Sequence, residues 1–169
     1  MDNRKCIYFV EGECEEKMLN ALKVIPSLII NGKVKKFNAI TEELTNSKLI
    51  TISPGSRVVF VFDTDVVLTT HLKNNIEFLK TKCSRIEVLT IPQVSNFEDE
   101  IKNSTDITKA QDFTKSKTVD DFKKSVNKMK PAEFRNALQR HKFDIKVLWT
   151  KKPPKSFSFV SQDGDKIKK

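Results

Sequence analysis

The chain has 169 residues and a formal net charge of +9, from 31 Lys and Arg against 22 Asp and Glu. This length suits one domain with a core of its own. No apolar run approaches the roughly 18 residues that cross a bilayer, and the first residues show no secretory signal pattern. Three cysteines without a Cys-x-x-Cys spacing exclude a self-contained four-cysteine zinc module and favour the reducing cytoplasm.

The first hundred residues alternate between apolar strand-like runs and helix-like periodicity. Strands are predicted at 5–10, 33–40, 57–62 and 85–91, and helices at 13–25, 41–47 and 70–82. The run at 57–62 is apolar after its first residue, as expected for a central parallel strand that is covered on both faces. The alternation predicts an α/β fold with a mainly parallel sheet flanked by helices.

The rest of the chain has a different character. Helices are predicted at 97–102, 118–130 and 131–141, and a last strand at 145–149. The final residues, with Pro153-Pro154 and a lysine-rich end, are expected to form a loose basic tail. We therefore expect an α/β domain over 1–102, a helical extension packed on it over 103–150, and the tail over 151–169.

The charge is unevenly divided between these parts. Residues 1–100 hold 13 basic and 14 acidic residues, whereas residues 101–169 hold 18 basic and 8 acidic ones. One interpretation is that the first part holds metal and the second part binds a polyanion. The other is that the second part has a solvated, lysine-rich surface.

Acidic residues follow three of the predicted strands: Glu11, then Asp63 and Asp65, then the run Glu98–Glu100. The carboxyl ends of parallel strands share one edge of a sheet, where binding sites form. Carboxylates gathered there repel one another unless a cation or a proton lies between them. The pattern predicts a site for a hard cation such as Mg²⁺. The alternative is that these acids only cap turns and the first turns of helices.

Two of these acidic motifs resemble those of a known family. Val-Glu-Gly-x-x-Glu at Val10–Glu15 precedes, by about fifty residues, an apolar strand ending in Asp-x-Asp at Asp63–Asp65. This order and spacing resemble the TOPRIM domain of topoisomerases, primases, OLD-type nucleases of phage defence and ribosomal RNA maturation nucleases. The likeness covers roughly residues 5–100 and implies a TOPRIM-like, Rossmann-like catalytic domain over 1–102. The acids at Asn96–Glu100 resemble, more loosely, a further acidic position of the OLD-like and maturation-type members.

Features that several members of the family need are missing from this sequence. The only tyrosine, Tyr8, lies inside the first predicted strand, so no topoisomerase nucleophile is available. The cysteines cannot build a zinc module of the primase kind, and the Gly-x-x-x-x-Gly-Lys-Ser/Thr motif of an ATPase is absent. The resemblance is therefore to small stand-alone TOPRIM nucleases, in which metal-activated water hydrolyses phosphodiester bonds of RNA or DNA.

The resemblance implies a role for each matching acid. Glu11 would be a general acid/base or a ligand near the scissile phosphate. Asp63 and Asp65 would bind Mg²⁺ or Mn²⁺, and Glu15 and Glu98 would be secondary ligands that help to hold a second ion. The expected partners are a nucleic acid and, by the same resemblance to phage-defence proteins, a separately encoded ABC-type ATPase. A further copy of the chain is another candidate partner, and no membrane is expected.

Other residues complete these expectations. Gly12 would let the backbone turn sharply beneath Glu11. Lys151, Lys152 and Lys155, which flank the proline pair, are predicted to follow a phosphate backbone.

Two other functions stay open. The chain would be a nucleic-acid-binding or regulatory TOPRIM subunit if its acids are only structural. Phe-Val-Phe-Asp-Thr-Asp also resembles the first motif of haloacid-dehalogenase-type phosphatases, with Asp63 as nucleophile and Asp65 as acid/base. That motif leaves Val-Glu-Gly-x-x-Glu unexplained.

Overall fold

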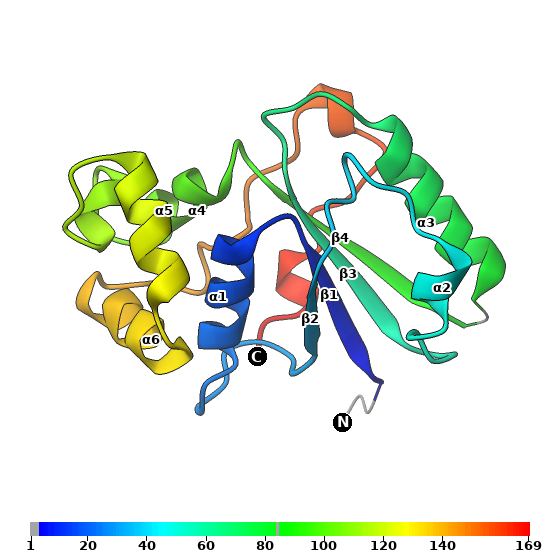
Figure 1. Ribbon diagram of the computed structural model, residues 1–169, viewed down its shortest axis with the longest axis horizontal. Helices are drawn as coiled ribbons and strands as arrows, with labels where there is room; N and C mark the ends of the chain where they lie inside the picture. Colours follow the sequence, from blue (N-terminus) through cyan, green and yellow to red (C-terminus); the bar gives the residue numbers. More distant parts are fainter. Residues whose placement is uncertain (1–3, 84) are drawn as a thin grey trace.

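A four-stranded parallel sheet forms the centre of the molecule (Figure 1). The computed structural model describes residues 4–83 and 85–169. The sheet has the order β2-β1-β3-β4, and every neighbouring pair is parallel. Its strands are β1 (Cys6–Val10), β2 (Lys33–Lys36), β3 (Arg57–Asp63) and β4 (Glu87–Gln93). The predicted α/β class with a parallel sheet is confirmed, and the arrangement is consistent with a Rossmann-like fold.

Both faces of the central strands are apolar, because β1 and β3 are almost continuously apolar and successive side chains point to opposite sides. Tyr8 and Val10 of β1 join a core that contains residues of α1, α4, α5 and α6, and we call this side the helical face. Phe9 of β1 and Phe60 of β3 lie on the other side, the α3 face, and their rings stack 5.7 Å apart. The helices are α1 (Glu13–Leu22), α2 (Asn46–Leu49), α3 (Thr70–Lys82), α4 (Phe97–Asn103), α5 (Val119–Lys128) and α6 (Pro131–Arg140).

Most helices lie where the periodicity predicts them, and α3 has the predicted bounds. The helix predicted at 41–47 is wrong in position, since α2 covers Asn46–Leu49. The side chain of Asn38 instead accepts hydrogen bonds from the backbone N–H groups of Ile40 and Thr41, which makes a turn after β2. None of the helices in the described residues is long and apolar enough to cross a bilayer.

The strand predicted at 145–149 is wrong: this segment is a turn. Its apolar residues Leu148 and Trp149 are fully buried. The apolar pattern therefore predicted burial correctly but predicted the wrong secondary structure. The backbone N–H of Trp149 donates to Glu100 Oε2 at 3.1 Å instead of to a neighbouring strand. Residues 161–163 lie along the outer edge of β4, where a fifth strand would pair, and form hydrogen bonds with Thr90.

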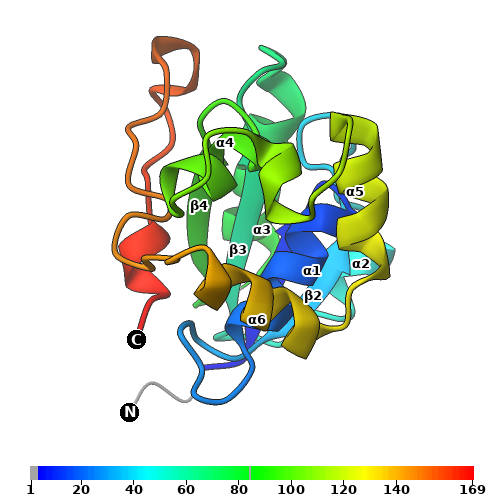
Figure 2. The ribbon, with the colours of Figure 1, turned by 90° about the vertical axis from the view of Figure 1, so that its left-hand side faces the viewer.

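Residues 151–169 do not form the loose tail that their composition predicts, because the segment runs along the outer side of β4 (Figure 2). Asp163 Oδ2 accepts a hydrogen bond from the Thr90 backbone N–H at 3.0 Å, and the Asp163 N–H donates to the Thr90 carbonyl at 2.9 Å. Phe157 is buried on the α3 face and Ile167 on the helical face. The segment is therefore part of the core and covers an edge that would otherwise be open to pairing.

Asp163 is the residue whose loss should expose this edge. We expect Asp163→Ala to lower the free energy of unfolding by about 1–3 kcal/mol, because the Thr90 N–H would lose its partner. Asp165→Ala is the matched control, since that side chain is 82% exposed and makes only a surface ion pair. Urea unfolding of the variants measures both values. Equal stability of the two variants would contradict the assigned role of Asp163.

Candidate functional site

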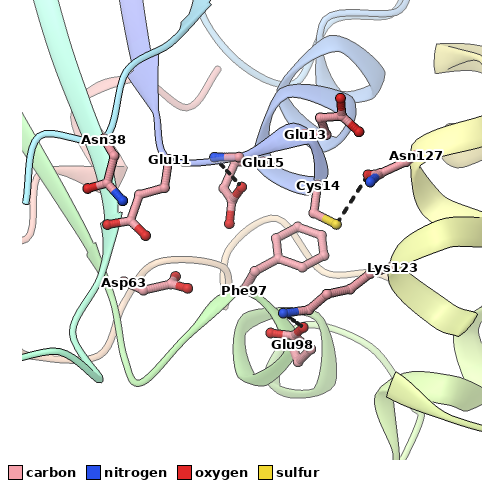
Figure 3. Close-up of a pocket in the computed structure, with 11 residues that line it drawn as sticks. Glu11, Glu13, Cys14, Glu15, Asn38, Asp63, Phe97, Glu98, Lys123 and Asn127 are labelled. Carbon is pink, nitrogen blue, oxygen red and sulfur yellow. Dashed lines mark hydrogen bonds and ion pairs between the residues drawn. The ribbon is translucent and has the colours of Figure 1, made fainter. Parts of the chain in front are cut away.

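The carboxyl ends of β1 and β3 open into a hollow of about 350 Å³, which we call the acid pocket (Figure 3). Five carboxylates line it: Glu11 after β1, Glu13 and Glu15 in the first turn of α1, Asp63 at the end of β3, and Glu98 in the first turn of α4. The sequence predicted Glu11, Glu15, Asp63 and Glu98 as site residues, and the structure brings these four to one hollow. The other lining residues are Gly12, Cys14, Asn38, Phe97, Lys123 and Asn127.

Strand register brings Glu11 and Asp63 to the same edge. Val10 pairs with Val61 in the parallel ladder between β1 and β3, so the two acids follow at nearly the same level of the sheet. Glu98 is delivered by α4, which begins at an N-cap where Asn96 Oδ1 accepts from the Asp99 N–H at 3.0 Å. Hydrogen bonds of the sheet and of the α4 N-cap thus set the positions of these acids. Contacts between the carboxylates are not needed to place them.

Gly12 has a different role from the one predicted. It is the N-cap of α1, and its φ of −140° and ψ of −172° are an extended conformation that other residues adopt without strain. The backbone turn therefore does not require glycine. A side chain here would crowd Glu15, because a Cβ on Gly12 would lie 3.1 Å from Glu15 Oε2. The same Oε2 accepts a hydrogen bond from the Gly12 N–H at 3.1 Å, so glycine leaves room for the folded-back carboxylate.

Burial and mutual repulsion make the acid pocket unfavourable for negative charge. Burial, with the Glu15 charge next in importance, raises the pKa of Glu11 to about 7. Burial, followed by the charges of Glu15 and Glu11, raises the pKa of Asp63 to about 9. Burial also raises the pKa of Glu15. Near neutral pH the pocket therefore holds protons or attracts a cation.

Three of the five carboxylates already have partners in the fold. Glu15 is held by the Gly12 N–H, Glu98 Oε1 lies 2.8 Å from Lys123 Nζ, and Glu13 Oε1 lies 3.2 Å from Lys36 Nζ. By contrast, no Lys, Arg or His of the described residues forms an ion pair with Glu11 or Asp63 (Figure 3). Asp63 Oδ1 is buried, and no group in residues 4–83 and 85–169 donates a hydrogen bond to it. Glu11 and Asp63 are thus the carboxylates left for an external cation.

The residues that could contact a cation in this pocket are two carboxylates, Glu11 and Asp63. Within residues 4–83 and 85–169, no three or more His, Cys, Asp or Glu side chains are arranged to hold a metal ion by themselves. Mg²⁺ commonly binds through one or two carboxylates and completes its octahedron with waters and substrate phosphates. Glu11 and Asp63 could supply two such carboxylates, whereas the described residues form no closed, all-protein metal cage.

The structure does not bring Asp65 into the acid pocket as predicted for a metal ligand. Its side chain is exposed, one residue after Thr64, whose N–H still donates to the Gln93 carbonyl at the end of β4. Its charge still raises the pKa of Asp63 and Glu11, so it lies near the mouth of the pocket. Glu100, in the same acidic run as Glu98, is buried and accepts from the N–H groups of Val94 and Trp149, which is a structural role.

Neither Tyr8 nor Cys14 is suited to act as a nucleophile. Tyr8 is fully buried, and its hydroxyl donates to the Ile30 carbonyl at 2.7 Å. Cys14 lines the acid pocket, but burial raises the pKa of its thiol to about 12, with the Glu15 charge as a smaller cause. The thiol therefore stays protonated near neutral pH.

The predicted phosphate-binding lysines lie outside the acid pocket. Lys151, Lys152 and Lys155 are exposed, and none of them lines it. The lysine that does enter the pocket is Lys123 of α5, which was not predicted. The period of its helix was readable from the sequence, but a period does not say which surface a helix covers. Asn127 of α5 was missed for the same reason, whereas Asn38 lies in the turn after β2, where no motif marked it.

The raised pKa of Asp63 predicts a pH dependence of stability. In the fold this pKa rises from 3.8 to about 9, so over that interval the folded state retains a proton that the unfolded state releases. Metal-free protein should therefore lose stability as pH rises from about 4 to about 9. We expect Asp63→Asn, which cannot ionise, to reduce that loss by more than about 1 kcal/mol, measured by urea unfolding across the range. Parallel pH profiles for the two proteins would contradict the burial of this carboxyl.

Comparison of the chain with models of known protein families, with curated protein sequences and with solved structures finds no match. The likeness of Val10–Glu15 and Asp63–Asp65 to TOPRIM motifs therefore stays a prediction from the sequence. The fold and the acid pocket are established by the geometry described above.

Proposed function

We propose that this chain is a TOPRIM-like nuclease that uses Mg²⁺ or Mn²⁺ to hydrolyse phosphodiester bonds in RNA or DNA. One observation carries the proposal: Glu11 and Asp63 meet at the carboxyl edge of the sheet, partly buried and without a cationic partner among the described residues. Lys123 lies on the other side of the same hollow. Carboxylates for a cation and a lysine for a phosphate are the two elements that such a reaction needs.

Each residue has a defined role in this proposal. Asp63 would hold the ion with its unpartnered oxygen, and the bound ion would supply Lewis-acid stabilisation and a more acidic water. Glu11, whose pKa is about 7, would take the proton from the attacking water or return one to the leaving oxygen. Lys123 would place positive charge beside the phosphate.

A non-catalytic nucleic-acid-binding subunit is the second candidate. It is favoured by the partners that Glu15 and Glu98 already have, since these are the acids that would hold a second metal ion. The phosphatase alternative is not supported in the same way. A phosphatase of that kind would need a further pair of acids after a later strand. Of the candidate pair Asp163 and Asp165, Asp163 is buried and accepts a hydrogen bond from the Thr90 N–H.

A cleavage assay separates these candidates. Purified protein is incubated with single-stranded and duplex RNA and DNA, with Mg²⁺ or Mn²⁺ and then with chelator. We expect metal-dependent cleavage that falls at least about 100-fold in Glu11→Gln and Asp63→Asn. Asp65→Asn should cost less than about 10-fold, because that side chain lies outside the pocket.

The control is Glu16→Gln, which removes an acid from the same turn of α1 but outside the acid pocket, and it should leave cleavage unchanged. Cleavage that persists in both Glu11→Gln and Asp63→Asn would sink the site assignment. Binding of nucleic acid without cleavage under any condition would favour the non-catalytic subunit.

A further inference from the structure

A second hollow of about 380 Å³ adjoins the acid pocket on the helical side. It lies between the start of α4, the segment before η1 (Ala110–Phe113) and α5. Glu98 and Lys123 line both hollows, so the two hollows lie on either side of this ion pair. We call the second hollow the lysine groove, because Lys102, Lys109 and Lys123 line it.

The lysine groove differs from the acid pocket in its charge. Its two acids are both neutralised by lysines, since Glu98 pairs with Lys123 and Asp99 pairs with Lys102. Lys109 remains as an exposed positive charge, and Gln111 adds an uncharged polar side chain to the lining. A surface with this excess of donors suits a phosphate, whereas the acid pocket suits a cation.

The position of Lys123 links the two environments. It comes from α5, in the basic part of the chain, and its ammonium points to Glu98 at the junction of the hollows (Figure 3). The Glu98 side chain is 12% exposed and that of Lys123 is 52% exposed. Lys123 can therefore reach a ligand from the solvent side while Glu98 stays beneath it.

We propose that a nucleic-acid strand with one phosphate in the acid pocket continues through the lysine groove, with Lys123 between the hollows and Lys109 on a following phosphate. This inference rests on the proposed function, and it names the part of the surface that holds the substrate. It also moves the main phosphate contacts from the end of the chain to α5 and the segment before η1.

The lysines near the end of the chain are the competing surface. Lys155 begins η2 (Lys155–Phe157), whose Phe157 packs against Phe62 on the α3 face, away from the lysine groove. Lys151 lies closer, because its charge lowers the pKa of Asp99 in α4. The strand path proposed here therefore requires Lys109 and Lys123 and does not require Lys155.

Binding measured without cleavage tests this path. Fluorescence anisotropy with labelled single-stranded RNA and DNA is recorded in chelator, using the full chain carrying Glu11→Gln so that substrate stays intact. In that background we expect Lys109→Glu to weaken binding by about fivefold or more and to lower the slope of log K against log salt by about 1. Lys123→Met should also weaken binding, and it provides a second variant from a different element.

Lys80→Glu is the matched control, because it makes the same change of charge at an exposed site on α3 and should leave affinity within twofold of the parent. Lys155→Glu serves as the competing variant, because it tests the other lysine surface.

The outcomes separate the strand path from the nuclease. If Lys155→Glu weakens binding while Lys109→Glu behaves like Lys80→Glu, the strand path is overturned. Cleavage by the wild-type chain that Lys109→Glu leaves unchanged also rejects the path and leaves the nuclease standing. Weaker binding by Lys109→Glu together with no cleavage by wild type rejects the nuclease and keeps the path.

Discussion

Partial burial of carboxylates that also repel one another, at one edge of the sheet, is the constraint on which the site depends. Parallel pairing of β1 with β3 sends Glu11 and Asp63 out of the sheet at the same level. Burial then raises the pKa of both groups, and the neighbouring charge of Glu15 adds to the effect. A fold that keeps such groups together is less stable than one that separates them, unless protons or a cation compensate the charge. This cost is the physical reason to look for function at this edge.

Other interactions of the sheet offset the unfavourable free energy of that edge. Apolar residues on both faces of β1 and β3 hold the central strands in place. The last segment of the chain occupies the outer edge of β4, where Asp163 satisfies the Thr90 N–H. Glu100 is a buried carboxylate of a different kind, because two backbone N–H groups bind it and it joins α4 to the turn at Trp149. The molecule thus contains acids that stabilise the fold and acids that do not.

The uneven division of charge has a structural counterpart at the acid pocket. The helices after α4 belong to the basic part of the chain, and α5 packs beside α1 on the helical face. Packing there brings Lys123 to Glu98, so one positive charge of the basic part lies inside the acidic site. The two parts are therefore not independent modules, because a lysine from one completes the hollow formed by the other.

Much of the fold was predictable from local patterns. The apolar runs at β1, β3 and β4 and the helical period of α3, α5 and α6 depend on neighbouring residues in the sequence, and parallel pairing follows from their alternation. Acids at strand ends predicted the candidate site for the same reason, since all parallel strands end at one edge. The errors at 41–47, 145–149 and 151–169 share one cause. There, backbone N–H groups donate hydrogen bonds to the side chains of Asn38, Glu100 and Asp163, and these bonds decide the structure.

The sequence by itself determined which acids gather at the carboxyl edge, because Glu11, Asp63 and Glu98 each follow a strand by a few residues. Only the tertiary structure decided which of them are available. Glu98 is paired with Lys123, Glu15 is folded back onto Gly12, and Asp65 lies outside the pocket. These differences arise from contacts between segments that are distant in the chain and from changes of backbone direction after a strand ends. The periodicity and spacing of residues in the sequence do not describe long-range contacts or changes of backbone direction. Side-chain burial and the positions of interaction partners in the fold do describe them.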